Sequence, residues 1–229
     1  MVSMNADLAK RLRQNVADFY EVHGKSFDRT RAFVWNEEKL AISKIQPGMT
    51  VVDVGAGNGR FARLLPEGVN YLGIEPSEAL RAAANPNIQM RAGGFPKLDP
   101  PDQMSDTTVC FAVIQHLPTQ EDRRAAVEEL IRITKRRGWI IATSWHPTGR
   151  FSRQDVSVIE HGELGDVWVS WHAEGAEAQR YIHDFSFDEW RSLWNHPNLV
   201  IEHIGLFGQN DWTEDLNEGR NWCVIAQRQ

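Results

Sequence analysis

The sequence contains few cysteines and no long apolar segment, and these absences exclude several classes of protein. Only two of the 229 residues are cysteine, Cys110 and Cys223, and each lies in a hydrophobic run. We therefore expect buried, reduced thiols, and without a C-x-x-C pair or a His–Cys cluster we expect no metal site. No run approaches the roughly 18 apolar residues of a membrane helix. The N-terminus has no apolar signal region, so we expect a cytoplasmic protein with no membrane attachment.

Positive charge is also scarce. The net charge is −6, and residues 146–229 carry 6 basic and 14 acidic groups, 6 − 14 = −8. Because phosphate neutralisation requires clustered Lys and Arg, this composition does not favour strong nucleic-acid binding by the chain alone. The one dense basic cluster, within residues 132–137, is predicted to end a helix, where cations complement the helix dipole.

The spacing of apolar residues predicts alternating strands and helices in the first two thirds of the chain. A helix is expected over residues 6–24 and a second one, capped by Asn36, before Pro47. Short β-branched runs then predict strands over residues 49–55, 70–76, 87–93, 107–114 and 138–145. Helices are expected between them, the last of them capped by Thr119. This alternation is typical of a doubly wound, mostly parallel α/β sheet.

The alternation breaks after the fifth strand. Residues 155–162 and 166–172 are β-like runs separated by polar residues, so we expect an insertion over residues 146–185. A helix over 186–195 and strands over 198–208 and 221–227 should complete a seven-stranded sheet. We predict one domain over residues 1–229, with a helical cap (1–47), a cofactor-binding half (48–145), the insertion on the substrate side, and C-terminal strands (186–229).

The most specific motif is the loop Asp53-Val54-Gly55-Ala56-Gly57-Asn58-Gly59 after the first strand. Glycines there permit a tight turn and close approach of a ligand to the backbone, although a plain βα turn is the simpler structural reading. Glu75 ends the second strand, where an acid can accept hydrogen bonds from both hydroxyls of a ribose. Position 60 is Arg, so the loop lacks the G-x-G-x-x-G form typical of dinucleotide binding.

These segments, VVDVGAGNGR and YLGIEPSEAL, resemble the cofactor motifs of class I S-adenosylmethionine-dependent methyltransferases. The resemblance implies S-adenosylmethionine as cofactor and S-adenosylhomocysteine as product. One departure is Gly93, which stands where these enzymes commonly have an acid that contacts the adenine amino group. The residues expected at the cofactor are Asp53, Gly55, Ala56, Gly57, Asn58, Gly59, Glu75, Pro76, Gly93, Gly94, Phe95, Ala112 and Val113.

Five further segments, two of them in the insertion, resemble the family that methylates a carboxymethyl group on the wobble uridine of tRNA, and its bacterial and archaeal relatives. They are the Thr30-Arg31…Trp35 segment, the AVIQHL run over residues 112–117, the DVWVSW and RYIHDF runs of the insertion, and the GRNWCVI run over residues 219–225. The resemblance implies a methyl ester as product. Eukaryotic members work with a small activating subunit, so such a partner is a further expectation.

A carboxylate acceptor is already an anion at neutral pH, so its methylation needs positioning and a cation rather than a base. Arg31 is the candidate cation, although a surface position is an alternative. His116 follows the fourth strand and His146 the fifth, at the edge where ligands bind in such sheets. Each could contact the acceptor, and His116 could instead cap the turn before Pro118.

Aromatic residues and one histidine are candidates for contacts with a flat substrate such as a base. Core packing is the competing interpretation for each tryptophan, and a structural position in a strand is the alternative for the histidine. These candidates are Trp35, Trp145, Trp171, Tyr181 and His183.

Two other functions remain open from the sequence. The acidic composition favours a small-molecule acceptor, methylated at oxygen or nitrogen, for which His116 or His146 would act as a general base. The absence of an acid at Gly93 suggests the other alternative, a non-catalytic partner protein that binds S-adenosylmethionine. The fold alone does not decide among these functions.

Overall fold

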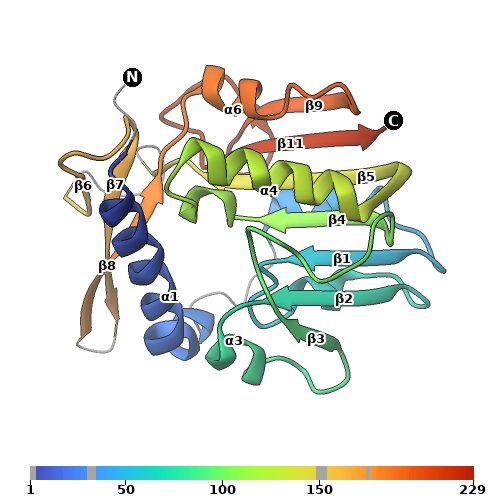
Figure 1. Cartoon of the computed structure of the whole chain (residues 1–229). Helices are drawn as coiled ribbons and strands as arrows, with labels where there is room; N and C mark the ends of the chain where they lie inside the picture. The colour runs from blue at the N-terminus through green and yellow to red at the C-terminus, as the bar shows by residue number, and fades with distance from the viewer. Residues whose placement is uncertain (1–3, 30–34, 148–153, 174–175) are drawn as a thin grey trace.

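The computed structural model describes residues 4–29, 35–147, 154–173 and 176–229. Its centre is an eight-stranded sheet with the strand order β10-β9-β11-β5-β4-β1-β2-β3. In Figure 1 the strands lie one below another in this order, from β9 at the top to β3 at the bottom. The strands are β1 Thr50–Val54, β2 Asn70–Glu75, β3 Gln89–Ala92, β4 Ser105–Phe111, β5 Thr134–Trp145, β9 Leu199–Phe207, β10 Trp212–Thr213 and β11 Asn221–Arg228.

The predicted doubly wound, mostly parallel sheet is confirmed. Strand β1 pairs in parallel with β2 and β4, and β2–β3 and β4–β5 are also parallel pairs. Strand β11 runs antiparallel to both β5 and β9. The prediction of seven strands is short by one, because the two-residue strand β10 pairs antiparallel with the end of β9. A strand that short gives no hydrophobic alternation to detect in the sequence.

The helices are α1 Ala6–Arg29, α2 Asn36–Ile42, α3 Glu78–Ala82, α4 Gln120–Ile133 and α6 Phe187–Leu193, with two short 3₁₀ turns at Arg60–Leu64 and Ile114–His116. Figure 1 shows α4 and α6 on the near face of the sheet. The hydroxyl of Thr119 accepts a hydrogen bond from the Asp122 N–H, which confirms the predicted cap of α4.

Three local predictions about helix ends are wrong. Asn36 is the first residue of α2, and the capping position belongs to Trp35. The glycine loop leads into a 3₁₀ turn instead of an α-helix. Helix α4 ends at Ile133 and β5 begins at Thr134 without an intervening loop. Most of the basic cluster, Lys135 to Arg137, therefore begins a strand, and its charges do not serve the helix dipole.

The predicted insertion contains a second, three-stranded antiparallel sheet of β6 Val156–Val158, β7 Asp166–Ala173 and β8 Ala176–His183. Helix α1 packs on this small sheet. The side chain of Asn15 donates to the carbonyl of Gln179 and accepts from the N–H of Tyr181, both at 3.0 Å. Figure 1 shows α1 and the small sheet together beyond the carboxyl ends of β1, β2 and β4. They therefore cover the edge of the main sheet at which ligands bind in this fold class.

Both cysteines are buried and free, as predicted, and burial raises the pKa of each thiol. None of the helices in the described ranges is long and apolar enough to cross a membrane. Within the same ranges, no three His, Cys, Asp or Glu side chains are grouped as metal ligands.

Candidate active site

A pocket of about 510 Å³ lies at the carboxyl edge of the main sheet, beneath α1. Its wall combines the ends of β1, β2 and β4 with residues from α1 and from the segment before α2. Most of the residues predicted from the sequence line it: Trp35, Asp53, Gly55, Ala56, Gly57, Asn58, Glu75, Pro76, Gly94, Phe95, Ala112, Val113, His116 and Trp145.

The glycine loop requires glycine at two positions for different reasons. Gly55 has φ = +74°, and a Cβ there would lie 2.2 Å from Cγ2 of Val113, so both the backbone and the packing exclude a side chain. Gly57 has φ = +58°, but no atom lies within 4 Å of the position its Cβ would take. The space beside Gly57 is therefore left open to the pocket, as a loop that binds a ligand through its backbone requires.

Glu75 connects this loop to the next turn of the sheet. One carboxylate oxygen accepts the Gly57 N–H at 3.0 Å, and the other accepts the Ser77 N–H at 2.9 Å. The side chain is only 5% exposed, and burial raises its pKa although the two backbone hydrogen bonds act in the opposite direction. Each carboxylate oxygen has two lone pairs, so Glu75 retains acceptor capacity for two hydroxyls in the pocket.

Asp53, one residue before the end of β1, lines the floor of the pocket. Its Oδ2 accepts a hydrogen bond from the Tyr71 hydroxyl at 2.8 Å. Burial raises the pKa of Asp53 to about 7, because the charged form loses its water while the hydrogen bond from Tyr71 compensates only in part. A cation in the pocket would favour the ionised form.

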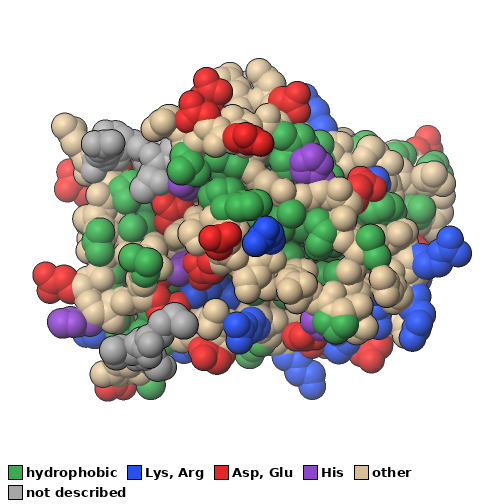
Figure 2. All heavy atoms as spheres, turned by 90° about the horizontal axis from the view of Figure 1, so that it is seen from above, with side chains coloured by type: hydrophobic (Ala, Val, Ile, Leu, Met, Phe, Trp, Pro, Cys, Tyr) green, Lys and Arg blue, Asp and Glu red, His purple; other side chains and the backbone are tan. Residues whose placement is uncertain are grey.

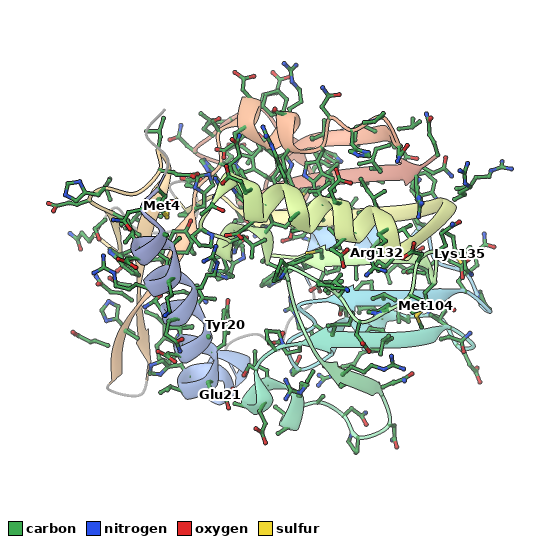
Figure 3. The ribbon with its side chains drawn as sticks, in the orientation of Figure 1. Met4, Tyr20, Glu21, Met104, Arg132 and Lys135 are labelled. Atoms are coloured by element: carbon green, nitrogen blue, oxygen red, sulfur yellow. The ribbon has the colours of Figure 1, made fainter. Side chains whose placement is uncertain are left out.

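Helix α1 supplies part of the pocket wall that the sequence analysis did not identify. Four residues of α1 line the pocket: Val16, Ala17, Tyr20 and Glu21. Ala17, Tyr20 and Glu21 follow Val16 by one, four and five residues, a spacing that places all four side chains on one side of a helix. This periodicity was available in the sequence, but nothing in it showed which face would meet the sheet. Figure 3 shows Tyr20 pointing from α1 toward the sheet and Glu21 where α1 meets α3.

Glu21 fastens α1 over the pocket. Its Oε2 accepts hydrogen bonds from the hydroxyl of Ser77 and the N–H of Glu78, both at 3.0 Å. Ser77 is itself the N-cap of α3. The carboxylate of Glu21 thus lies at the positive end of this short helix, next to the turn that Glu75 holds.

A second contact that the sequence analysis missed involves Glu38 and Arg60. Their side chains form an ion pair, and the guanidinium of Arg60 lies 4.0 Å from the ring centroid of Trp35. The backbone N–H of Trp35 donates to Glu38 at 3.0 Å. Burial raises the pKa of Glu38, and the charge of Arg60 opposes that shift. All three residues line the pocket, so this cluster fixes a second part of its wall.

His116 lies at the end of the segment that follows β4. Ala112, at the start of this segment, has φ = +56°, and its N–H donates to the carbonyl of Thr143 at 3.0 Å. The Nδ1 of His116 lies 3.0 Å from the carbonyl oxygen of Tyr181, and its Nε2 lies 2.9 Å from the Tyr20 hydroxyl. A carbonyl oxygen only accepts hydrogen bonds, so Nδ1 carries the ring proton and donates. In the neutral ring, Nε2 then accepts a hydrogen bond from the Tyr20 hydroxyl. Both ring nitrogens are therefore engaged.

Several predicted site residues do not line the pocket. Gly59 packs against Ile88 and Met90, and Gly93 packs against Ile74. His146 is buried, with its Nδ1 2.9 Å from Asp184. Trp171 packs on Phe19 and His23. Arg31, the predicted cation, lies outside the described residues.

Tyr181 and His183 are also outside the pocket, because they lie on one face of β8. The Tyr181 hydroxyl donates to Asp166 at 2.8 Å, and the two ring nitrogens of His183 lie 2.8 Å from Asp166 and 2.8 Å from Glu189. Burial alone would lower the pKa of His183, but the hydrogen bonds to the two carboxylates outweigh it and raise the pKa. These residues join the small sheet to α6. This structural role is sufficient reason for their presence in the RYIHDF segment.

Comparison with known proteins shows which proteins this chain is similar to. Residues 52–142 match the model of a methyltransferase domain. The chain is 25% identical to the tRNA (carboxymethyluridine(34)-5-O)-methyltransferase of Schizosaccharomyces pombe over 93% of this chain and 96% of the relative. It is 26% identical to the Arabidopsis thaliana protein of the same name, over 55% of this chain and 31% of the relative. The chain thus spans about a third of the length of the plant relative.

Solved structures show the same fold. A Haloferax volcanii methyltransferase, solved in complex with the Trm112 methyltransferase activator, is 17% identical, with a TM-score of 0.63 over 93% of this chain and 97% of that one. A Burkholderia thailandensis 1,6-didemethyltoxoflavin-N1-methyltransferase, solved with its substrate and S-adenosylhomocysteine, is 13% identical, with a TM-score of 0.65 over 100% of this chain and 92% of that one.

The described pocket fits S-adenosylmethionine, the cofactor expected from the sequence. Glu75 and the open backbone at Gly57 lie where a ribose and the amino acid part of the cofactor would be held. The lining also suits a cation such as a sulfonium. Among the described residues of the wall, five side chains are acidic (Asp18, Glu21, Glu38, Asp53 and Glu75) and two are arginines (Arg13 and Arg60).

The two glycines of the loop are expected to respond differently to alanine. Gly55→Ala should lower the free energy of unfolding by about 2–4 kcal/mol, because the new methyl group overlaps Val113 and the backbone is strained. Gly57→Ala should cost only about 1 kcal/mol yet weaken S-adenosylmethionine binding, because its methyl group enters the open space. Denaturant unfolding and calorimetric titration measure the two effects. Equal affinity in wild type and Gly57→Ala would show that no ligand approaches this loop.

The raised pKa of Asp53 gives a pH-dependent stability. Between the ordinary Asp pKa of 3.8 and the raised pKa of about 7, Asp53 is protonated in the folded protein and ionised in the unfolded chain. Ionisation of Asp53 therefore destabilises the fold progressively over that range and fully above pH 7. The side-chain oxygen of Asn can still accept a hydrogen bond from the Tyr71 hydroxyl. We therefore expect Asp53→Asn to raise the free energy of unfolding by roughly 1–3 kcal/mol at pH 8 and by much less at pH 5. A gain that is the same at both pH values would contradict this assignment.

Proposed function

We propose that this chain, a class I S-adenosylmethionine-dependent methyltransferase, methylates the carboxylate of a carboxymethyl group on the wobble uridine of tRNA. The similarity to the S. pombe enzyme, which extends over nearly the full length of both chains, supports this substrate. The similarity to the Arabidopsis protein supports it over a shorter stretch. The side chains of the pocket support a carboxylate acceptor independently of these similarities.

The engagement of His116 is the observation that carries the proposal. A hydroxyl or amine acceptor must lose a proton during methylation, so it needs a base at the reacting end of the pocket. His116 is the histidine in the described wall, and its Nε2 already accepts the Tyr20 hydroxyl. His146, the other predicted base, pairs with Asp184 outside the pocket. A carboxylate needs no base, so it suits this arrangement better than a neutral acceptor.

The proposed mechanism therefore consists mainly of positioning. When bound, S-adenosylmethionine would supply a methyl group on a sulfonium, for in-line transfer to a carboxylate oxygen with S-adenosylhomocysteine as the leaving group. Glu75 and Asp53 hold the cofactor end of the pocket. Tyr20 and Trp35 present aromatic surfaces on which a uracil can stack. Helix α1, fastened by Glu21, excludes water from the reacting atoms.

A small-molecule acceptor is the second candidate. Residues 146–229 carry a net charge of −8 from 6 basic and 14 acidic groups. On the face that Figure 2 shows, described Lys and Arg side chains are interspersed with acidic and hydrophobic ones. Such a surface offers weak attraction to RNA phosphates. The B. thailandensis neighbour, which was solved with 1,6-didemethyltoxoflavin bound, supports such an acceptor for a protein of this fold.

An activating partner would reconcile a tRNA substrate with this charge distribution. The H. volcanii methyltransferase of similar fold was solved with the Trm112 activator. We propose that this chain also works with a small activating subunit that supplies part of the RNA-binding surface. Activity on tRNA should then be low for the isolated chain and increase when the partner is added.

The bond that is formed provides the most specific test of the proposed function. The protein, with and without a co-expressed Trm112-type subunit, is incubated with methyl-labelled S-adenosylmethionine and tRNA that carries carboxymethyluridine at the wobble position. We expect label in the tRNA that mild alkali releases as methanol, because esters are saponified whereas N-methyl groups and ethers are stable.

Matched substrates complete this experiment. The same tRNA with unmodified uridine at the wobble position should accept no label. Alkali-stable label, or equal labelling of the two tRNAs, would contradict a carboxymethyl acceptor. Absence of labelling with the partner present, together with turnover of a small molecule, would establish the second candidate in its place.

A further inference from the structure

A fully buried arginine lies directly behind the pocket wall. Arg180 of β8 is 2% exposed. Its guanidinium carbon lies 4.6 Å from the ring centroid of Phe19 and 4.5 Å from that of Trp145. Burial lowers the pKa of Arg180, but a guanidinium remains charged at neutral pH. Because burying a charge is costly, its place beside the pocket calls for a functional reason.

Arg180 is linked to the pocket by a hydrogen bond to the hydroxyl group of Tyr20. Its Nη1 donates a hydrogen bond to the Tyr20 oxygen at 3.1 Å, and Tyr20 lines the pocket. Tyr20 in turn donates to the Nε2 of His116, 2.9 Å away. Because Arg180 occupies an acceptor position of the Tyr20 oxygen, the hydroxyl is oriented as a donor, and a neighbouring cation strengthens such a donor.

We propose that Arg180 is a positioning residue that makes this end of the pocket selective for an anionic acceptor, acting through the hydroxyl of Tyr20. The inference rests on the proposed carboxylate chemistry but does not depend on tRNA. The acidic residues of the wall, among them Glu21 and Glu38, repel a carboxylate. A fixed cation behind Tyr20 offsets that repulsion where the acceptor would bind. The hydroxyl proton, held by His116 in the structure, can be donated instead to a carboxylate oxygen.

Neither arginine that lines the described wall offers the same arrangement. Arg60 pairs with Glu38, and Arg13 pairs with Asp122. The side chain of Arg13 is also 48% exposed, so water screens its charge. Arg180 is shielded from water by Phe19 and Trp145, so its field in the pocket is screened far less.

Selectivity is measured with two probes that differ in charge and have nearly the same shape. 5-Carboxymethyluridine carries the carboxylate, and 5-carbamoylmethyluridine is its neutral amide. With S-adenosylhomocysteine present, binding is followed by the fluorescence of the tryptophans, of which Trp35 and Trp145 line the pocket. We expect wild type to prefer the acid over the amide by about 10- to 100-fold, the range of a charge-assisted hydrogen bond.

The variants Arg180→Met, Arg180→Lys and Tyr20→Phe locate the source of this preference. Arg180→Met should abolish it, Arg180→Lys should retain part of it, and Tyr20→Phe should remove most of it while leaving the buried charge in place. With a carboxylate substrate that turns over, Arg180→Met should raise KM more than it lowers kcat. If Arg180→Met does not fold, Arg180→Lys and Tyr20→Phe still decide the question.

Arg123 offers a matched control. It is also fully buried, but it pairs with Glu163 and Glu189 on the side of α4 and does not line the pocket. Arg123→Met should lower stability and leave the preference for the acid unchanged. Equal binding of acid and amide by wild type, or an unchanged preference in Arg180→Met, would overturn the inference. Preference for the acid that depends on Arg180, without methylation of tRNA, would support the inference and contradict the tRNA substrate.

Discussion

The carboxylate of Glu75 holds together the two turns on which the pocket depends. By accepting the N–H groups of Gly57 and Ser77, it joins the loop after β1 to the start of α3. Glu21 contacts the same turn from the other side and so fixes α1 over the pocket. The cofactor end and the covering helix are thus positioned by two acidic residues around one short stretch of backbone.

The opposite end of the pocket depends on the insertion. Strand β8 directs alternate side chains to its two faces. Tyr181 and His183 join the network of Asp166 and Glu189, whereas Arg180 approaches Tyr20 on α1. One strand therefore supplies both the anchoring of the small sheet and a buried positive charge beside an otherwise acidic pocket. This division of charge fits a cationic cofactor at one end and the proposed anionic acceptor at the other.

The elements with strong local patterns could be predicted from the sequence, and the contacts between distant segments could not. Buried β-branched runs gave the parallel strands, and the spacing from Asp53 to Glu75 gave the cofactor end of the pocket. The two-residue strand β10 and the direct passage from α4 to β5 leave no periodic signal. Tyr20 and Arg180 are 160 residues apart, and neither belongs to a pattern that predicts their contact.

Short motifs also could not separate residues that bind ligands from residues that support the fold. Gly59 and Gly93 resemble cofactor positions but pack against apolar side chains. Trp171, Tyr181 and His183 belong to segments that resemble a methyltransferase family, yet their side chains serve packing or ion pairs. His146 follows the fifth strand, but its side chain pairs with Asp184. In each case the direction of the side chain decides the role, and direction follows from tertiary packing.

Calorimetric titration of S-adenosylmethionine into wild type and Glu75→Gln tests most directly whether Glu75 organises the cofactor site. Gln places an N–H₂ group opposite a backbone N–H that needs an acceptor, so we expect a loss of affinity of tenfold or more. Glu78→Gln, an exposed change three residues away on α3, should bind as wild type does. Equal affinity in all three proteins would show that Glu75 does not organise the cofactor site.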